Sequence, residues 1–216
     1  MLRSVFHQQL EQAAEHIQEL GNNTLMQLDR AIDGFEQGDD SQIDEIIKND
    51  ASINKNELDL NERVFDIIAR QQPVASDLRM VIVVMKIAGD LERVADLAVD
   101  MAKVSRRLTH YETAGVRDEL VQLAKDARQM VAQALVAYQN KDVLAAQQLA
   151  RLDDEIDERF GRFIKKLFRQ EVKEQDVEMI TQLAFIARYV ERIADYATNL
   201  SEWIIYEANG QHFDLN

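Results

Sequence analysis

Two copies of one acidic pattern hold the residues of this 216-residue chain whose types and spacing suit chemistry. Each copy places three oxygen-bearing side chains four residues apart, so they share one face of a helix over about 12 Å. Carboxylate and amide oxygens suit hard cations, so the pattern predicts sites for Mg²⁺, Ca²⁺, Mn²⁺ or iron. The six predicted metal ligands are Glu92, Asp96, Asp100, Glu191, Asp195 and Asn199.

An acidic stripe on an amphipathic helix is also a common form of solvated surface. Arg93 is placed to pair with Asp96 and Lys103 with Asp100, although each such pair contributes only about 0.2–0.5 kcal/mol. Repetition of the stripe favours a functional interpretation. Shared ancestry of the two halves would preserve a non-functional stripe equally well, so both interpretations stay open.

Further polar residues are spaced to join these stripes. The second-half group contains three aspartates in "LDDEIDERF", and the first-half group consists of their rough counterparts. For both groups the alternative is again a solvated face. The residues are Asp153, Asp154, Asp157, Asp50, Asn54 and Glu57.

Long helices are predicted to position all of these side chains. The chain has one proline and seven glycines, and helical periodicity continues along most of it. Gly34, Gly38 and Pro73 mark expected breaks, and Ser76 is an expected helix cap. The predicted helices span residues 4–35, 40–70, 76–108, 116–140, 143–170 and 176–209.

An internal repeat organises these helices into two halves. "KIAGDLERVADLAVD" at 86–100 aligns with "FIARYVERIADYATN" at 185–199, and both copies fall on the third helix of their half. We therefore predict an all-α fold of six long helices, arranged as two tandem three-helix bundles with pseudo-twofold internal symmetry. The expected domains are residues 1–110 and 111–216.

The third helix also carries an apolar seam that runs from Val84 to Met101 with heptad-like spacing. At 100° per residue, Glu92 and Asp96 lie far round the helix from this seam. The acid stripe is therefore expected outside the centre of its own bundle. It would face solvent, a neighbouring helix or a groove between the halves.

The composition excludes several kinds of partner and location. A formal charge of −14 disfavours nucleic acid, because binding it requires neutralisation of phosphates. The absence of cysteine fits a reducing cytoplasm. The N-terminus reaches charged residues too early for a signal peptide, and the apolar run Met80–Met85 is too short to span a bilayer. Any membrane association is expected to be peripheral.

Enzymatic groups are scarce in the sequence. There is no glycine-rich phosphate loop, and none of the four histidines follows a glutamate by three residues, as di-iron bundles require. We therefore predict a non-enzyme. A carboxylate-bound iron or manganese enzyme and a metal-independent helical scaffold remain the alternatives.

The two E-R-[VI]-A-D motifs, together with "RQQPVASDLR" and the C-terminal "SEWIIYEANGQHFDLN", resemble the PhoU family of phosphate-uptake regulators. The resemblance covers essentially the whole chain. It implies two three-helix bundles and a cytoplasmic accessory protein without enzymatic activity. The implied role is negative regulation of the phosphate regulon, through contact with the ATPase of a phosphate ABC transporter and a phosphate-sensing histidine kinase. A homodimer is also implied.

The resemblance implies surface-bound metal at the two acid motifs, with iron, zinc, manganese or magnesium as candidates, none required for the fold. This chain departs from the family pattern in three ways. Ala95 and Ala194 replace frequent glycines, and Tyr196 replaces a frequent histidine, which weakens the case for zinc. Asp100 replaces a frequent asparagine. Because of Asp100, the first copy is expected to be the better metal site.

Overall fold

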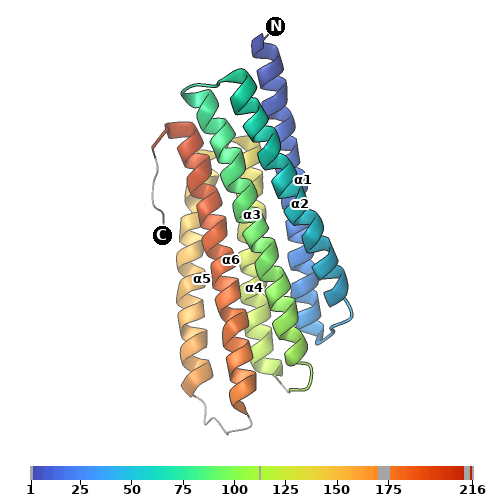
Figure 1. The fold of residues 1–216 in the computed structure, drawn as a ribbon. Helices are drawn as coiled ribbons and strands as arrows, with labels where there is room; N and C mark the ends of the chain where they lie inside the picture. The colour runs from blue at the N-terminus through green and yellow to red at the C-terminus, as the bar shows by residue number, and fades with distance from the viewer. Residues whose placement is uncertain (1, 112, 170–175, 212–214, 216) are drawn as a thin grey trace.

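A computed structural model describes residues 2–111, 113–169, 176–211 and 215 of the chain. The described residues form six long helices. They run side by side, and neighbours along the chain are antiparallel (Figure 1). The predicted all-α class is confirmed. The helices are α1 (Leu2–Gln37), α2 (Ile43–Gln71), α3 (Ser76–Arg107), α4 (Ala114–Asn140), α5 (Val143–Arg169) and α6 (Val177–Asn209).

Helix ends differ from the predictions by a few residues. Helix α1 continues past Gly34, whose carbonyl accepts a hydrogen bond from the Asp39 amide, and ends before Gly38 with φ +66°. Helix α2 begins at Ile43 rather than at residue 40, after a short turn. Ser76 is the first residue of α3 rather than its cap. The predicted end at residue 170 lies outside the described residues.

Each half packs its three helices against one another, and the halves meet along two further helix pairs. Contacts within halves join α1, α2 and α3, and likewise α4, α5 and α6. Between the halves, α3 contacts α6 and α1 contacts α4. One continuous hydrophobic core includes buried residues from all six helices. The division at residues 110 and 111 falls in the loop between α3 and α4 and stays a prediction.

Buried positions fix the correspondence between the two halves. Ile17 and Phe35 of α1 correspond to Leu120 and Tyr138 of α4, and residues between them match in burial. Helices α2 and α5 match in the same way. The pairs in these two helices are Ile43 with Ala146, Ile46 with Leu149, Ile53 with Ile156 and Leu60 with Phe163. For α3 and α6, the repeated motif gives the register directly.

The interior holds the apolar side chains, and the surface is strongly charged. Ile17, Leu28, Val94 and Leu183 are fully buried, whereas the acidic and basic side chains are mostly exposed or half-buried. No helix among the described residues is long and apolar enough to cross a membrane.

Candidate metal centre

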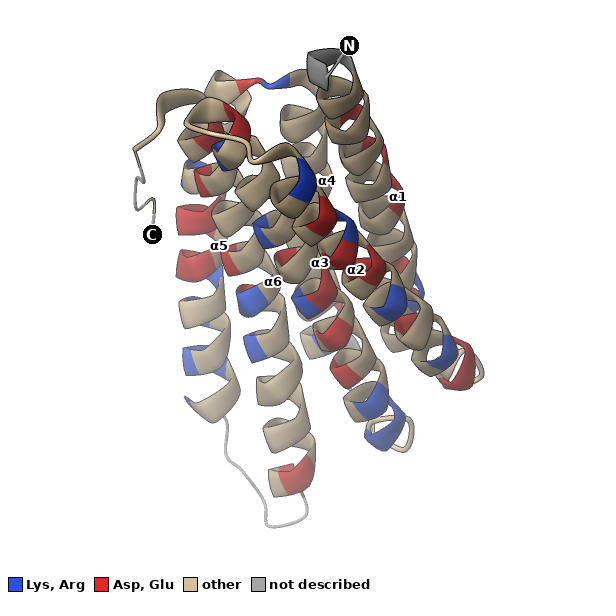
Figure 2. Ribbon diagram, turned by 45° about the horizontal axis from the view of Figure 1, so that its top comes forward, with Lys and Arg blue, Asp and Glu red and all other residues tan. Residues whose placement is uncertain are grey.

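The acid stripe of the second half faces the neighbouring helix of its own bundle. Three carboxylates, Asp157 of α5 with Glu191 and Asp195 of α6, place one oxygen each within 4.8 Å of the other two. This agrees with one of the three orientations expected from the helical wheel. Figure 2, in which Asp and Glu are red, shows acidic positions at mid-length of α5 beside α6. We call this set the second-half cluster.

The second-half cluster is partly shielded from water. The Glu191 side chain is 12% exposed, and its Oε2 atom has no hydrogen-bond partner among the residues described. The other Glu191 oxygen accepts a bond from Arg188, which is largely exposed. A buried carboxylate oxygen without a partner is costly, and it is one that a cation would satisfy.

Burial and mutual repulsion raise the pKa of Glu191 and Asp195. Burial is the larger cause for Glu191 and Asp195; the charge of Asp195 adds to it at Glu191, and that of Asp157 adds to it at Asp195. A shared pair of like charges resists full ionisation. A divalent cation would reverse this effect by favouring the ionised forms.

A fourth carboxylate lies beside the cluster on the preceding turn of α5. Asp153 is 5% exposed, and its Oδ1 atom has no partner within the described chain. Burial, followed by the charges of Asp157 and Asp195, raises the pKa of Asp153 to about 6. The negative charge of the site therefore extends inward from the cluster.

The first half arranges its stripe differently. Arg93 binds both Glu92, at 3.5 Å from Nε to Oε2, and Asp96, at 3.0 Å from Nη1 to Oδ2. One guanidinium thus occupies the two carboxylates that correspond to Glu191 and Asp195. Lys103 lies 3.7 Å from Asp100. Burial, followed by the charge of Asp96, raises the pKa of Glu92.

Helix α2 completes the first-half site with an amide at the position of Asp157. Asn54 stands where Asp157 stands in the second half, and its buried Oδ1 has no partner among described residues. Asp50, the counterpart of Asp153, accepts a hydrogen bond of 3.0 Å from Gln27 Nε2. Glu57 accepts one from Asn61. In the described part of the chain, no group of three close carboxylates forms in this half.

The structure therefore brings together two of the six predicted ligands and adds one. Asp100 belongs to no group of three close carboxylates among the described residues. Asn199, one turn beyond Asp195, offers only an amide oxygen. That the first copy is the better equipped stays a prediction; among the described residues, the group of three close carboxylates forms in the second copy. For Asp157 the sequence leaves a solvated face as the alternative. The available signal is that Asp157 follows the buried Asp153 by four residues, on the same face of α5.

The second-half cluster fits a hard divalent cation. Its donors are carboxylate oxygens alone, which suit Mg²⁺, Mn²⁺ or iron, and the described chain places no histidine or thiolate within the group. The unpartnered Glu191 oxygen supplies an acceptor that no donor among the described residues uses.

Comparisons with known proteins agree on one family. The family model described as the PhoU domain matches residues 17–105 and again 120–204. A phosphate-specific transport system accessory protein PhoU homolog of Clostridium acetobutylicum is 31% identical and is covered in full, as is this chain. PhoU of Escherichia coli is 28% identical over 96% of this chain and 87% of that protein.

Solved structures agree in fold. The crystal structure of PhoU from Pseudomonas aeruginosa matches 95% of this chain and 100% of that chain, with a TM-score of 0.91 and 27% identity. The phosphate transport system regulatory protein PhoU from Streptococcus pneumoniae matches 97% and 99%, with a TM-score of 0.89 and 27% identity.

Proposed function

The chain belongs to the PhoU family, and we propose that it acts as an accessory regulator of a phosphate-specific transport system. The observation that carries this proposal is the double match of the family domain, one to each three-helix half. Relatives that align over most of their length are named as accessory proteins of such systems. These names describe regulators rather than enzymes.

The finer proposal is negative regulation of phosphate uptake and of the phosphate regulon. In it, the chain contacts the transporter ATPase and a phosphate-sensing histidine kinase in the cytoplasm, as a homodimer. The formal charge of −14 suits basic faces on these partners, because complementary charge speeds association. Membrane contact would then occur only through the transporter.

We further propose that the acid clusters bind metal, with the second-half cluster as the stronger site. Asp157, Glu191 and Asp195 would hold a hard divalent cation, which would neutralise the negative charge of the three close carboxylates. The first-half residues Glu92 and Asp96 would form a weaker site, because Arg93 already neutralises them. The bound cation would change the charge that a basic partner meets.

Copurification tests the regulatory proposal. The purified chain is mixed with the transporter ATPase and with the cytoplasmic part of the kinase, at low and high salt, with manganese or with chelator. We expect binding to at least one partner and weaker binding at high salt. Absence of binding to both, in every condition, would reject the adaptor role.

Elemental analysis and calorimetry test the metal proposal. Protein purified without chelator should carry a divalent metal, and Mn²⁺ should bind to chelator-treated protein. The matched variants are Glu191→Gln with Asp195→Asn, and Glu92→Gln with Asp96→Asn, which remove equal charge from the two halves. A protein without metal whose variants retain partner binding would instead be a metal-independent scaffold.

A further inference from the structure

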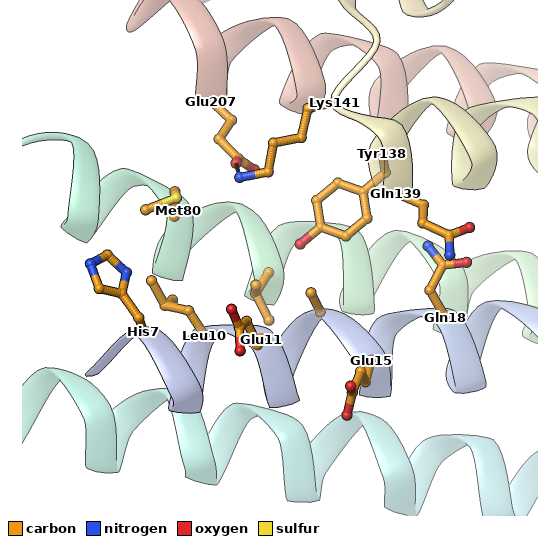
Figure 3. Close-up of a pocket in the computed structure, with 12 residues that line it drawn as sticks. His7, Leu10, Glu11, Glu15, Gln18, Met80, Tyr138, Gln139, Lys141 and Glu207 are labelled. Atoms are coloured by element: carbon orange, nitrogen blue, oxygen red, sulfur yellow. Dashed lines mark ion pairs between the residues drawn. The ribbon is translucent and has the colours of Figure 1, made fainter. Parts of the chain in front are cut away.

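A cavity of about 540 Å³ opens where the two halves meet, far from the acid clusters. It lies between the N-terminal part of α1, the start of α3, the end of α4 and the end of α6 (Figure 3). Leu10, Ala14 and Val84 give it an apolar wall. The cavity shares no lining residue with the proposed metal site. Ligand binding in the cavity can therefore be tested separately from metal binding and from the regulatory role.

The lining charges favour a cation. Glu11, Glu15 and Glu207 contribute three carboxylates, against one ammonium from Lys141 and the imidazole of His7. Lys141 lies 3.6 Å from Glu207, so Glu11 and Glu15 are left without an ion pair among the described side chains. Figure 3 shows the Lys141–Glu207 pair on one side of the cavity and Glu11 on the other, with the Tyr138 ring between them.

Tyr138 offers an aromatic face in this acidic space. Burial raises the pKa of Tyr138, and the charge of Glu207 adds to this, so the phenol stays neutral. A neutral ring attracts a cation through its electron-rich face. The described residues donate no hydrogen bond to its hydroxyl and accept none from it.

The pseudo-symmetric position in the other half shows what fits such a space. There Phe35 corresponds to Tyr138, and Arg117 corresponds to Ala14 when the buried positions of α1 and α4 are aligned. The Arg117 guanidinium carbon lies 5.5 Å from the centre of the Phe35 ring. Its Nε donates to Thr113 Oγ1 at 2.9 Å, and its Nη2 to the Leu108 carbonyl at 3.5 Å.

Small side chains differ in the matching way at the two ends. Gly38, the counterpart of Lys141, leaves room for Arg117, because a Cβ on Gly38 would lie 2.8 Å from its Nη1 atom. At the cavity, Ala14 is too short to fill the space over Tyr138, and Glu207 supplies a carboxylate where Leu108 stands at the other end. One end carries its own guanidinium. The cavity at the other end has acidic walls and no arginine among its described lining residues, and Arg79 lies close enough to Glu207 for its charge to act on that carboxylate.

We propose that the cavity binds an alkyl guanidinium, which lies over the Tyr138 ring as Arg117 lies over Phe35 and is paired with Glu11 and Glu207. The Glu15 carboxylate points away from the ring and adds negative charge at the edge of the cavity (Figure 3). A guanidinium matches this site better than an ammonium, because it is planar, stacks on aromatic rings and forms forked bonds with carboxylates. The group can come from an arginine of a protein partner or from a free guanidinium compound.

Calorimetry and protein-observed NMR with matched probes test this proposal. Butylguanidinium should bind about tenfold more tightly than butylurea, its neutral isostere, because the ring and the carboxylates act on charge. The peptide Ac-Ala-Ala-Arg-Ala-Ala-NH₂ separates the sources. Tighter binding of the peptide identifies a protein arginine, and equal binding identifies a free compound. Equal binding of butylguanidinium and butylurea would overturn the proposal.

Variants locate the bound group. Ala14→Arg should supply the guanidinium from within the chain and abolish butylguanidinium binding while the helical circular dichroism is unchanged. Glu11→Gln with Glu15→Gln should weaken binding several-fold without altering the packing. Asp44→Asn, a surface carboxylate on α2, is the matched control and should leave binding unchanged. Full affinity in either cavity variant would exclude this cavity as the site, and the glutamine variant decides if Ala14→Arg fails to fold.

Discussion

The two acid stripes have nearly the same sequence and different surroundings. In the first half, Arg93 folds onto Glu92 and Asp96. In the second half, the corresponding Arg192 donates to the Tyr196 hydroxyl at 3.0 Å and lies over its ring. Tyr196 replaces Leu97 of the first half, which offers no hydroxyl. The neighbouring residue thus decides where this arginine lies; in the second half Arg188 pairs with one oxygen of Glu191, while the other Glu191 oxygen has no partner among the described residues.

The facing helices enlarge this difference. Helix α5 presents Asp157 where α2 presents Asn54, so only the second half has a third carboxylate at this point among the described residues. Gln27 donates to Asp50, whereas the corresponding Asp153 has an oxygen without a partner in the described chain. The comparison teaches that a repeated motif specifies a helix face, and that its partners specify the chemistry of that face.

The largest expected effect comes from removing the second-half ligands. Glu191→Gln with Asp195→Asn should weaken Mn²⁺ binding by more than about 100-fold, since even outer-shell losses cost about 10–100-fold. The matched pair Glu92→Gln with Asp96→Asn should change it by less than about threefold, because Arg93 already compensates these charges. Titration calorimetry measures both. Equal losses in the two variants would remove the distinction between the halves.

Conversion of the first half should have the next largest effect. Asn54→Asp with Arg93→Gln gives it three carboxylates at the positions of the second-half cluster and removes the competing guanidinium, and we expect a second Mn²⁺ per chain with an affinity within about tenfold of the first. The stoichiometry from calorimetry is the measurement. Arg93→Gln alone serves as the control, because it releases Glu92 and Asp96 without adding a ligand. A single ion per chain in the double variant would contradict the comparison.

The pH dependence of stability should reveal the buried carboxyl of the second half. The pKa of Asp153 is raised to about 6, above its ordinary unfolded value of about 3.9. The folded chain therefore retains this proton to higher pH, and its contribution to the free energy of unfolding is present below pH 4 and lost as pH rises through 6. In chelator, Asp153→Asn should be more stable than the parent at pH 7.5 by about 1 kcal/mol, allowing for solvent screening.

Urea unfolding at pH 5.0 and pH 7.5 measures this effect. The gap between Asp153→Asn and the parent should be smaller at pH 5.0, because Asp153 is then largely protonated in the folded chain. Asp154→Asn, at an exposed position on the same helix, should show no such change. A gap that is constant with pH would show that packing rather than ionisation separates the two proteins.

The smallest expected effect concerns the arginine that Tyr196 holds. Tyr196→Leu reproduces the first-half residue and should let Arg192 turn toward the cluster, raising the dissociation constant for Mn²⁺ about threefold. Tyr196→Leu with Arg192→Gln should restore the parent affinity, because the competing charge is gone. A loss that persists in the double variant would assign the effect to Tyr196 itself.

Local sequence features determined most of the architecture. Apolar spacing, scarce glycine and proline, and the repeated motif predicted six helices in two related halves, because helix formation and seam position follow from local sequence. Boundaries were less accurate: Gly34 lies within α1, since its carbonyl is satisfied by the Asp39 amide beyond the helix. A glycine inside a long helix costs too little to end it.

The sequence also determined which residues share a face, including both stripes, because that depends on helical geometry alone. Only the tertiary structure decided which stripe forms a cluster. Asp157 lies close to Glu191 and Asp195 because α5 packs on α6. Neighbouring side chains determine that Arg93 pairs with Asp96 and that Arg192 bonds to Tyr196. The same holds for Ala14 and Tyr138, which line the cavity. A short side chain leaves a cavity only where other helices enclose the space, and helical spacing in the sequence does not predict that enclosure.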